Sequence, residues 1–187
     1  MNPVIEQLRE TIVELGATKS GALAVSDIKF DPAARKACEE NYCGNYDRNW
    51  TCPPLCGDVF ELIERAKGYQ SAVLFQSISS LKDSYDIEGM TEAADRHNEV
   101  VRSLQRLARD RFGDAVVLGS GGCSFCSVCA RVNDEPCRFP DEATTSLEAY
   151  GMYVSHIAKQ AGMKYINGQN TVTYFGMVLL KEPLETA

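Results

Sequence analysis

Eight cysteines are the residues of this 187-residue sequence that are best suited to chemistry. They form two groups, one within residues 38–56 and one within residues 123–137. The N-terminal stretch MNPVIEQLRE has no basic region followed by an apolar core, so we expect no secretory signal and a cytoplasmic location. Because the cytosol keeps thiols reduced and a chain of this length needs no disulfides to fold, we interpret the cysteines as metal ligands or redox groups.

The second group, here called the distal set, has the spacing C-x2-C-x2-C-x7-C. Three thiolates at successive intervals of three let a short loop wrap around one face of an iron–sulfur cubane, with a fourth ligand from further along the chain. Tetrahedral zinc is more often held by two C-x2-4-C pairs on either side of a longer linker. The spacing therefore favours a [4Fe-4S] cluster over zinc, with four candidate ligands: Cys123, Cys126, Cys129 and Cys137.

Two features next to the distal set bear on this interpretation. The match to the bacterial ferredoxin run is partial, because the last gap is seven residues and Pro136 precedes the final cysteine. Upstream, glycines let the backbone approach a cluster and turn N–H groups toward its sulfurs, which makes them candidate cofactor-binding residues. A phosphate-binding loop would end in Gly-Lys-Ser/Thr, and this one does not. The glycines are Gly119, Gly121 and Gly122.

The first group, here called the proximal set, has the spacing C-x4-C-x8-C-x3-C. Two pairs with a short linker could close a zinc site, and four thiolates could hold a second cluster, although the spacing fits no standard run. Radical chemistry with S-adenosylmethionine needs the spacing C-x3-C-x2-C. Cys52 and Cys56 match the first part, but the third cysteine would fall at position 59, which is Val59. Trp50 and Tyr46 are candidates to shield the site from water. The proximal cysteines are Cys38, Cys43, Cys52 and Cys56.

Other functional classes have less support. Covalent haem attachment is excluded because no histidine follows CSFC or CSVC. We expect His97 and His156 to be surface or partly buried side chains. The net charge of −7 argues against nucleic acid, and the apolar stretches are too short to span a membrane.

A long predicted helix carries a strip of three arginines: Arg102, Arg106 and Arg109. We expect a solvated face with Glu92–Arg96 and Glu99–Arg102 pairs. The alternative is a docking surface for an acidic redox partner protein.

Four helices and four strands are expected to position these residues. Apolar periodicity and capping signals predict helices over 3–15, 58–67 and 91–112, and a fourth whose apolar stripe runs from Leu147 to Ala161. Strands are predicted over 20–28, 71–78, 115–119 and 171–180. This alternation favours an α/β fold with a roughly four-stranded sheet and long helical crossovers, in one domain spanning 1–187. The alternative is an α+β two-layer sandwich.

Each cysteine-rich loop follows a strand, the proximal one the first strand and the distal one the third. Open α/β sheets place ligands outside the carboxyl ends of their strands. If the two strands run parallel, both loops lie at one edge of the sheet.

Two segments, NYDRNWTCPP (45–54) and GSGGCSFCSVCARVNDEPCRFPDEATTSLEAYG (119–151), give the chain a family resemblance. It resembles an uncharacterised cysteine-rich family described as predicted metal-binding proteins, over about residues 38–180. The resemblance implies metal binding and no established reaction. It also implies six ligands: Cys43, Cys52, Cys123, Cys126, Cys129 and Cys137.

These observations predict a metal-binding redox protein that transfers electrons or supports a partner enzyme. Arg138 and Glu148 are candidates to lie next to the metal ligands, and Arg138 would screen the negative charge of a cluster. One alternative is a structural zinc protein without redox activity. Another is an enzyme whose metal keeps an open coordination position.

Overall fold

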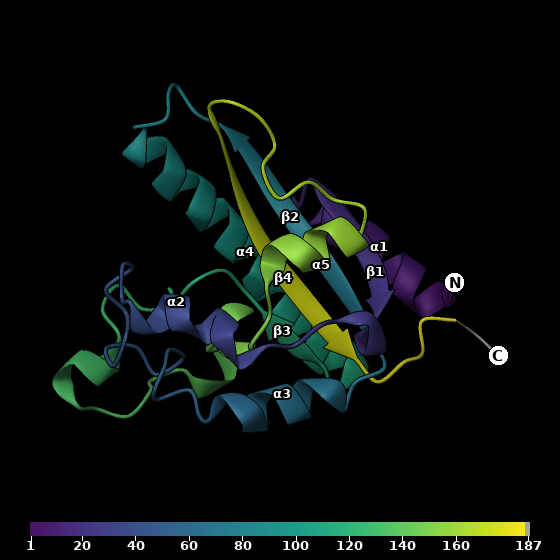
Figure 1. Ribbon diagram of the computed structural model, residues 1–187, viewed down its shortest axis with the longest axis horizontal. Helices are drawn as coiled ribbons and strands as arrows, with labels where there is room; N and C mark the ends of the chain where they lie inside the picture. The colour runs from purple at the N-terminus through teal and green to yellow at the C-terminus, as the bar shows by residue number, and fades with distance from the viewer. Residues whose placement is uncertain (186–187) are drawn as a thin grey trace.

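The computed structural model describes residues 1–185 and has a four-stranded sheet at its centre (Figure 1). The strands lie in the order β1-β2-β4-β3, and every neighbouring pair is antiparallel. The predicted four-stranded sheet with helical crossovers is thereby confirmed. The strands are β1 (Lys19–Ala24), β2 (Ser71–Ser80), β3 (Val116–Leu118) and β4 (Thr171–Leu180).

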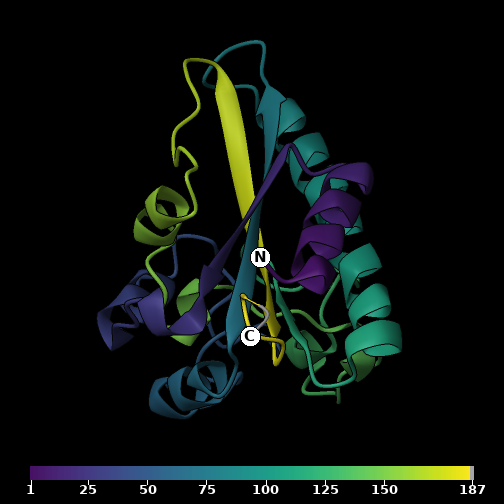
Figure 2. The same ribbon diagram turned by 90° about the vertical axis from the view of Figure 1, so that its right-hand side faces the viewer.

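One face of the sheet is covered by α1 (Pro3–Glu14) and α4 (Ile87–Phe112), as Figure 2 shows. Successive side chains of a strand point to opposite faces, so alternate residues of β2 and β4 meet these two helices. The helices contribute apolar residues at intervals of three and four, as their sequence periodicity predicts. This core includes Ile5, Leu8, Ile12, Val73, Phe75, Val100, Val101, Leu104 and Val178.

The opposite face carries α3 (Val59–Lys67) and α5 (Val154–Gln160) (Figure 2). Helix α3 begins as predicted, because the Asp58 carboxylate accepts hydrogen bonds from the N–H groups of Phe60 (2.8 Å) and Glu61 (3.3 Å). The second core lies here and includes Leu23, Leu62, Ala66, Leu74, Leu118, Met152, Ile157, Met177 and Leu179.

Both cysteine-rich segments lie at one end of the molecule, at the lower left of Figure 1. The proximal segment begins with η2 (Pro32–Arg35) and α2 (Lys36–Glu39), two short helices that the sequence interpretation missed. The distal segment is irregular except for η3 (Ala130–Asn133) and η4 (Pro140–Glu142). The ends of β3, α3 and these short helices therefore determine where the thiols lie.

The two strands that precede the cysteine-rich loops do not run parallel, which was the condition for both loops to lie at one edge of the sheet. Strands β1 and β3 run in opposite directions, since β1 is parallel in sense to β4 and β3 is antiparallel to it. The two loops still meet, because the chain after β1 runs across one face of the sheet to α2 (Figure 1). A bridge between Phe30 and Met152 and a hydrogen bond from Asp31 N–H to the Gly151 carbonyl (2.8 Å) hold this crossing in place.

The predicted helix through Leu147 and Ala161 is interrupted, so that expectation was wrong. The chain forms the single turn η5 (Glu148–Tyr150), then Gly151 adopts a left-handed conformation with φ 69°. Met152 next pairs with Phe30 as a β-bridge before α5 begins. The apolar spacing is kept across the break because both parts pack on the same face of the sheet.

Two other boundaries differ. Strand β1 ends at Ala24, where the chain turns into η1 (Val25–Asp27), and α4 begins one turn before the predicted residue 91. The earlier start follows from Asp86, whose carboxylate accepts a hydrogen bond from Gly89 N–H (3.0 Å). Within residues 1–185, none of the helices is both long and apolar enough to cross a bilayer.

Candidate metal centre

The four distal thiols line one small cavity. The space between them is about 20 Å³, which is the room of roughly one water molecule. Phe125, Phe139 and Trp50 form apolar parts of its wall. All four cysteines are half-buried and free. The fold therefore brings Cys123, Cys126, Cys129 and Cys137 together around one volume.

The thiols line this volume without forming a closed coordination shell. Among the side chains of residues 1–185, no three His, Cys, Asp or Glu residues are arranged to hold a metal ion. The donor set consists of thiols alone, which suits zinc or an iron–sulfur cluster and does not suit magnesium or calcium.

The proximal thiols form a second group, since the other three act on the charge state of Cys52, and Cys43 and Cys56 act on that of Cys38. Burial raises the pKa of Cys52 to about 12, and the thiols of Cys43, Cys38 and Cys56 raise it as well. Burial also raises the pKa of Cys38 to about 11, followed by the effects of Glu148 and Cys43. All four predicted proximal cysteines are therefore neighbours, including the two that the family resemblance did not supply.

A buried arginine lies beside the proximal set. Arg35 is only 7% exposed, and its guanidinium donates a hydrogen bond to the Gly57 carbonyl (2.7 Å), next to Cys56. Its positive charge lowers the pKa values of Cys38 and Cys56 against the larger effect of burial. The sequence interpretation missed this residue. Asp31 and Pro32 are a helix-start signal that would have placed Arg35 in the helix leading to Cys38.

The two residues named as candidates close to the ligands, Arg138 and Glu148, lie at different sets. Glu148 is half-buried near Cys38, and burial raises the pKa of its carboxyl group. Arg138 lies at the rim of the distal cavity, where it pairs with Glu135 (3.6 Å) and donates to the Val128 carbonyl (3.4 Å). The buried arginine is Arg35, beside the proximal thiols, while Arg138 is exposed.

The upstream glycines have more specific roles than predicted. The Gly119 N–H donates to the Thr145 carbonyl (2.9 Å), so it does not point at a sulfur. Gly121 has φ 72°, a conformation that favours glycine. A Cβ atom at Gly122 would lie 2.9 Å from the Cys52 sulfur and 3.1 Å from the Asn49 side-chain nitrogen. Only glycine fits at position 122 without displacing the proximal set.

The segment 49–51 joins the two sets. The Asn49 side-chain amide donates to the Cys123 carbonyl (2.9 Å), and the Cys123 N–H donates to the Thr51 hydroxyl (3.0 Å). The Trp50 ring N–H donates to the Glu135 carbonyl (2.9 Å). Trp50 was expected to shield the proximal set, but it forms part of the wall of the distal cavity instead.

Over residues 21–180, a span that includes both cysteine sets, the sequence matches a family model described as predicted metal-binding protein (DUF2284). The chain belongs to the DUF2284 family. This confirms the family resemblance, and metal binding is the function that the family description carries. The chain matches no curated protein and no solved structure.

The histidines of this DUF2284 protein lie away from the thiols. His97 is 1% exposed and packs between Phe75 and Tyr174, with its Nδ1 atom 2.9 Å from the Ser77 hydroxyl. Burial lowers its pKa to about 4, so the ring is neutral at physiological pH. The expectation of a surface or partly buried side chain was therefore wrong for His97 and is confirmed for the exposed His156.

The arginine strip of α4 is paired with acidic side chains, as the first interpretation expected. The predicted ion pairs Glu92–Arg96 (3.7 Å) and Glu99–Arg102 (3.1 Å) are present. Arg106 and Arg109 both pair with Glu142, at 3.7 and 3.4 Å. These pairs reduce the net positive charge that the strip could offer to an acidic partner.

Proposed function

We propose that the distal set holds a [4Fe-4S] cluster and that the protein transfers electrons or supports a partner enzyme in a reducing, cytoplasmic environment. The observation that carries this proposal is that four free thiols with C-x2-C-x2-C-x7-C spacing line one cavity. Thiolates are the usual ligands of such clusters, and three closely spaced ones can occupy one face of a cubane. The cluster supplies one-electron chemistry when bound.

Residues around the cavity would control how the cluster meets water and charge. Phe125 and Phe139 pack against each other, with ring centroids 4.8 Å apart, and cover one side of the distal thiols. Arg138 brings a positive charge to the rim. Solvent exposure and nearby charge are among the factors that set a cluster's potential, so these side chains are its candidate determinants.

The proximal set is proposed as a second metal site, for zinc or a second cluster. Four thiolates and the Glu148 carboxylate together carry more negative charge than one divalent ion neutralises. Arg35 supplies a buried positive charge next to Cys38 and Cys56. A buried charge is stable only when it is paired and hydrogen-bonded, and the thiolates together with the Gly57 carbonyl give Arg35 those partners.

The all-thiol donor set of the distal cavity also suits a second candidate function, that of a structural zinc protein. Zinc in a four-thiolate site contributes to folding and has no redox chemistry. Donor spacing thus supports a cluster, and the number and type of the donors also suit a single zinc ion.

Anaerobic reconstitution with iron and sulfide separates the two functions. The redox proposal expects broad absorption near ~400 nm and about four iron atoms for the distal set, with an electron paramagnetic resonance signal after one-electron reduction. The double substitution Cys126→Ser/Cys129→Ser should abolish this distal contribution. Colourless protein that retains stoichiometric zinc after reconstitution would contradict the cluster and support the zinc function.

A further inference from the structure

We propose that residues 49–51 couple the proximal and distal thiol sets, so that metal binding at either set strengthens binding at the other. This inference rests on the proposed metal-binding function and goes beyond it, because two separate sites need not influence each other. It assigns Asn49 and Thr51 the role of positioning residues that act through the cysteines.

Both backbone groups of the first distal cysteine are bound by this segment. The Cys123 N–H donates to the Thr51 hydroxyl (3.0 Å), and the Cys123 carbonyl accepts from the Asn49 amide (2.9 Å). Thr51 and Asn49 are themselves 7% and 4% exposed, so water cannot readily replace these bonds. The position of Cys123 therefore depends on the position of the 49–51 segment.

The same segment fixes a proximal cysteine. The Asn49 side-chain oxygen accepts hydrogen bonds from the Thr51 N–H (3.1 Å) and the Thr51 hydroxyl (3.0 Å). The Asn49 carbonyl accepts from the Cys52 N–H (2.9 Å). The Thr51 hydroxyl is thus a donor to Asn49 and an acceptor from Cys123. Asn49, Thr51 and Cys52 form one hydrogen-bonded turn.

A direct packing contact runs beside the hydrogen bonds. The Cys52 sulfur lies against the backbone of Gly122, where an added Cβ would come within 2.9 Å. When Cys52 turns toward a proximal metal, this contact changes, and Gly122 is bonded covalently to Cys123. The hydrogen bonds and the packing contact therefore both link the position of the proximal thiols to the position of the distal thiols.

The far side of the distal loop is attached to the same region. The Trp50 ring N–H donates to the Glu135 carbonyl (2.9 Å), two residues before Cys137. Arg131 lies over the Trp50 ring at 5.7 Å and pairs with Asp47 (3.0 Å). Metal binding at the proximal set would order residues 47–52, and so reduce the conformational entropy lost when the distal thiols close on a metal.

Coupling of this kind is a free energy shared by both sites, and it is reciprocal. Its typical size corresponds to a factor of 5 to 150 in affinity, and we expect about tenfold here. Anaerobic titration of the full-length protein with Co²⁺ measures it, since cobalt–thiolate complexes absorb strongly. Three proteins are compared: wild type, the distal-only Cys43→Ser/Cys56→Ser and the proximal-only Cys126→Ser/Cys129→Ser.

If the sets are coupled, wild type binds its second equivalent of Co²⁺ with an affinity about tenfold higher than expected from the sum of the two single-set binding curves. Thr51→Val, which keeps the shape and removes the hydroxyl, should reduce the wild-type curve to that sum. Thr51→Ser should retain the coupling. Thr18→Val is the matched control, because the Thr18 hydroxyl also accepts a backbone N–H bond, from Ile78 (2.9 Å), far from the thiols.

Two results would overturn the inference in distinguishable ways. Additive curves for wild type, or coupling that persists in Thr51→Val, would show that the sets bind metal independently and would leave the proposed function intact. Absence of cobalt binding by the folded distal-only protein would overturn both the coupling and the distal centre. Circular dichroism of each variant confirms that it is folded.

Discussion

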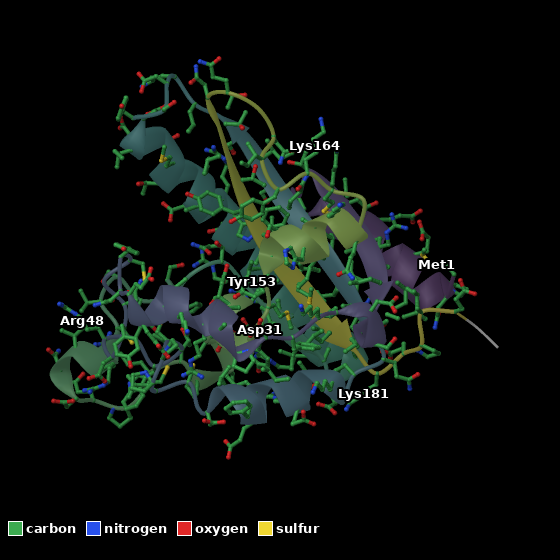
Figure 3. All side chains as sticks on the ribbon, in the orientation of Figure 1. Met1, Asp31, Arg48, Tyr153, Lys164 and Lys181 are labelled. Atoms are coloured by element: carbon green, nitrogen blue, oxygen red, sulfur yellow. The ribbon has the colours of Figure 1, made fainter. Side chains whose placement is uncertain are left out.

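The backbone of Gly122 lies against the sulfur of Cys52, although 70 residues of sequence separate them. The contact lies at the meeting point of the two cysteine-rich segments, whose positions are visible at one end of the molecule in Figure 3. It explains why the distal thiols follow a glycine directly: any side chain at position 122 would press on the sulfur of a proximal cysteine.

Substitution of Gly122 by alanine tests this contact. The added methyl group would overlap the Cys52 sulfur, and such overpacking typically costs about 1–3 kcal/mol. We expect a loss of this size in the free energy of unfolding measured by urea denaturation, together with weaker Co²⁺ binding. Ser120→Ala changes an exposed side chain in the same loop and should have little effect on either quantity. Equal behaviour of the two variants would contradict the contact.

Replacement of Arg35 by glutamine tests the charge balance of the proximal set. Loss of the buried positive charge removes an interaction that favours the thiolate forms of Cys38 and Cys56. Because an opposite charge shifts a pKa by about one unit or more, we expect proximal Co²⁺ affinity at pH 7 to fall about tenfold. The measurement is a titration of the Cys126→Ser/Cys129→Ser background.

Arg48→Gln is the control for this substitution. Arg48 lies in the same segment, at the outer edge of the molecule in Figure 3, and is exposed. Its removal should leave the proximal affinity within about twofold, because exposed charges are screened by solvent. A similar loss in both variants would mean that general charge, and not the buried position of Arg35, determines the affinity.

His97 makes stability depend on pH. Its pKa is about 4 in the folded protein and near the ordinary 6.5 when unfolded, so the unfolded chain binds the extra proton between these values. The stabilising contribution is complete above pH 6.5 and decreases as the pH falls toward about 4. The loss amounts to roughly 3 kcal/mol.

Urea denaturation between pH 4.5 and 7.5 measures this contribution, with His97→Gln as the test variant. Relative to wild type, the free energy of unfolding of His97→Gln should decrease less as the pH is lowered. The exposed His156 provides the comparison, and His156→Gln should follow the wild-type profile. Parallel profiles for wild type and His97→Gln would show that the ring binds a proton as readily in the folded as in the unfolded state, and would contradict the lowered pKa.

Much of the fold could be predicted from local patterns. Apolar spacing and the capping residues Asp58 and Gly68 predicted the bounds of α3 to within one residue. Runs of β-branched and apolar residues predicted the four strands. Strand order and direction could not be predicted in this way, because they depend on pairing between distant residues. The break between η5 and α5 also has a long-range cause, the bridge of Met152 with Phe30.

The candidate ligands were evident from their residue type and spacing, whereas their surroundings were not. Neither the burial of Arg35 beside the thiols nor the bonds from Asn49 and Thr51 to Cys123 has a periodic signal in the sequence. The sequence pattern of the NWT tripeptide likewise gives no sign of its hydrogen bonds to the distal loop. Its hydrogen bonds supply the physical reason for these residue types at these positions.

The most direct test of the distal centre is a crystal structure of the anaerobically reconstituted protein, with anomalous scattering measured at the iron and zinc absorption edges. We expect anomalous density in the cavity between Cys123, Cys126, Cys129 and Cys137, strongest at the iron edge, with each of the four sulfur atoms about 2.3 Å from a metal atom. Four sulfurs without anomalous density between them, or joined pairwise as disulfides, would contradict the assignment of a metal centre.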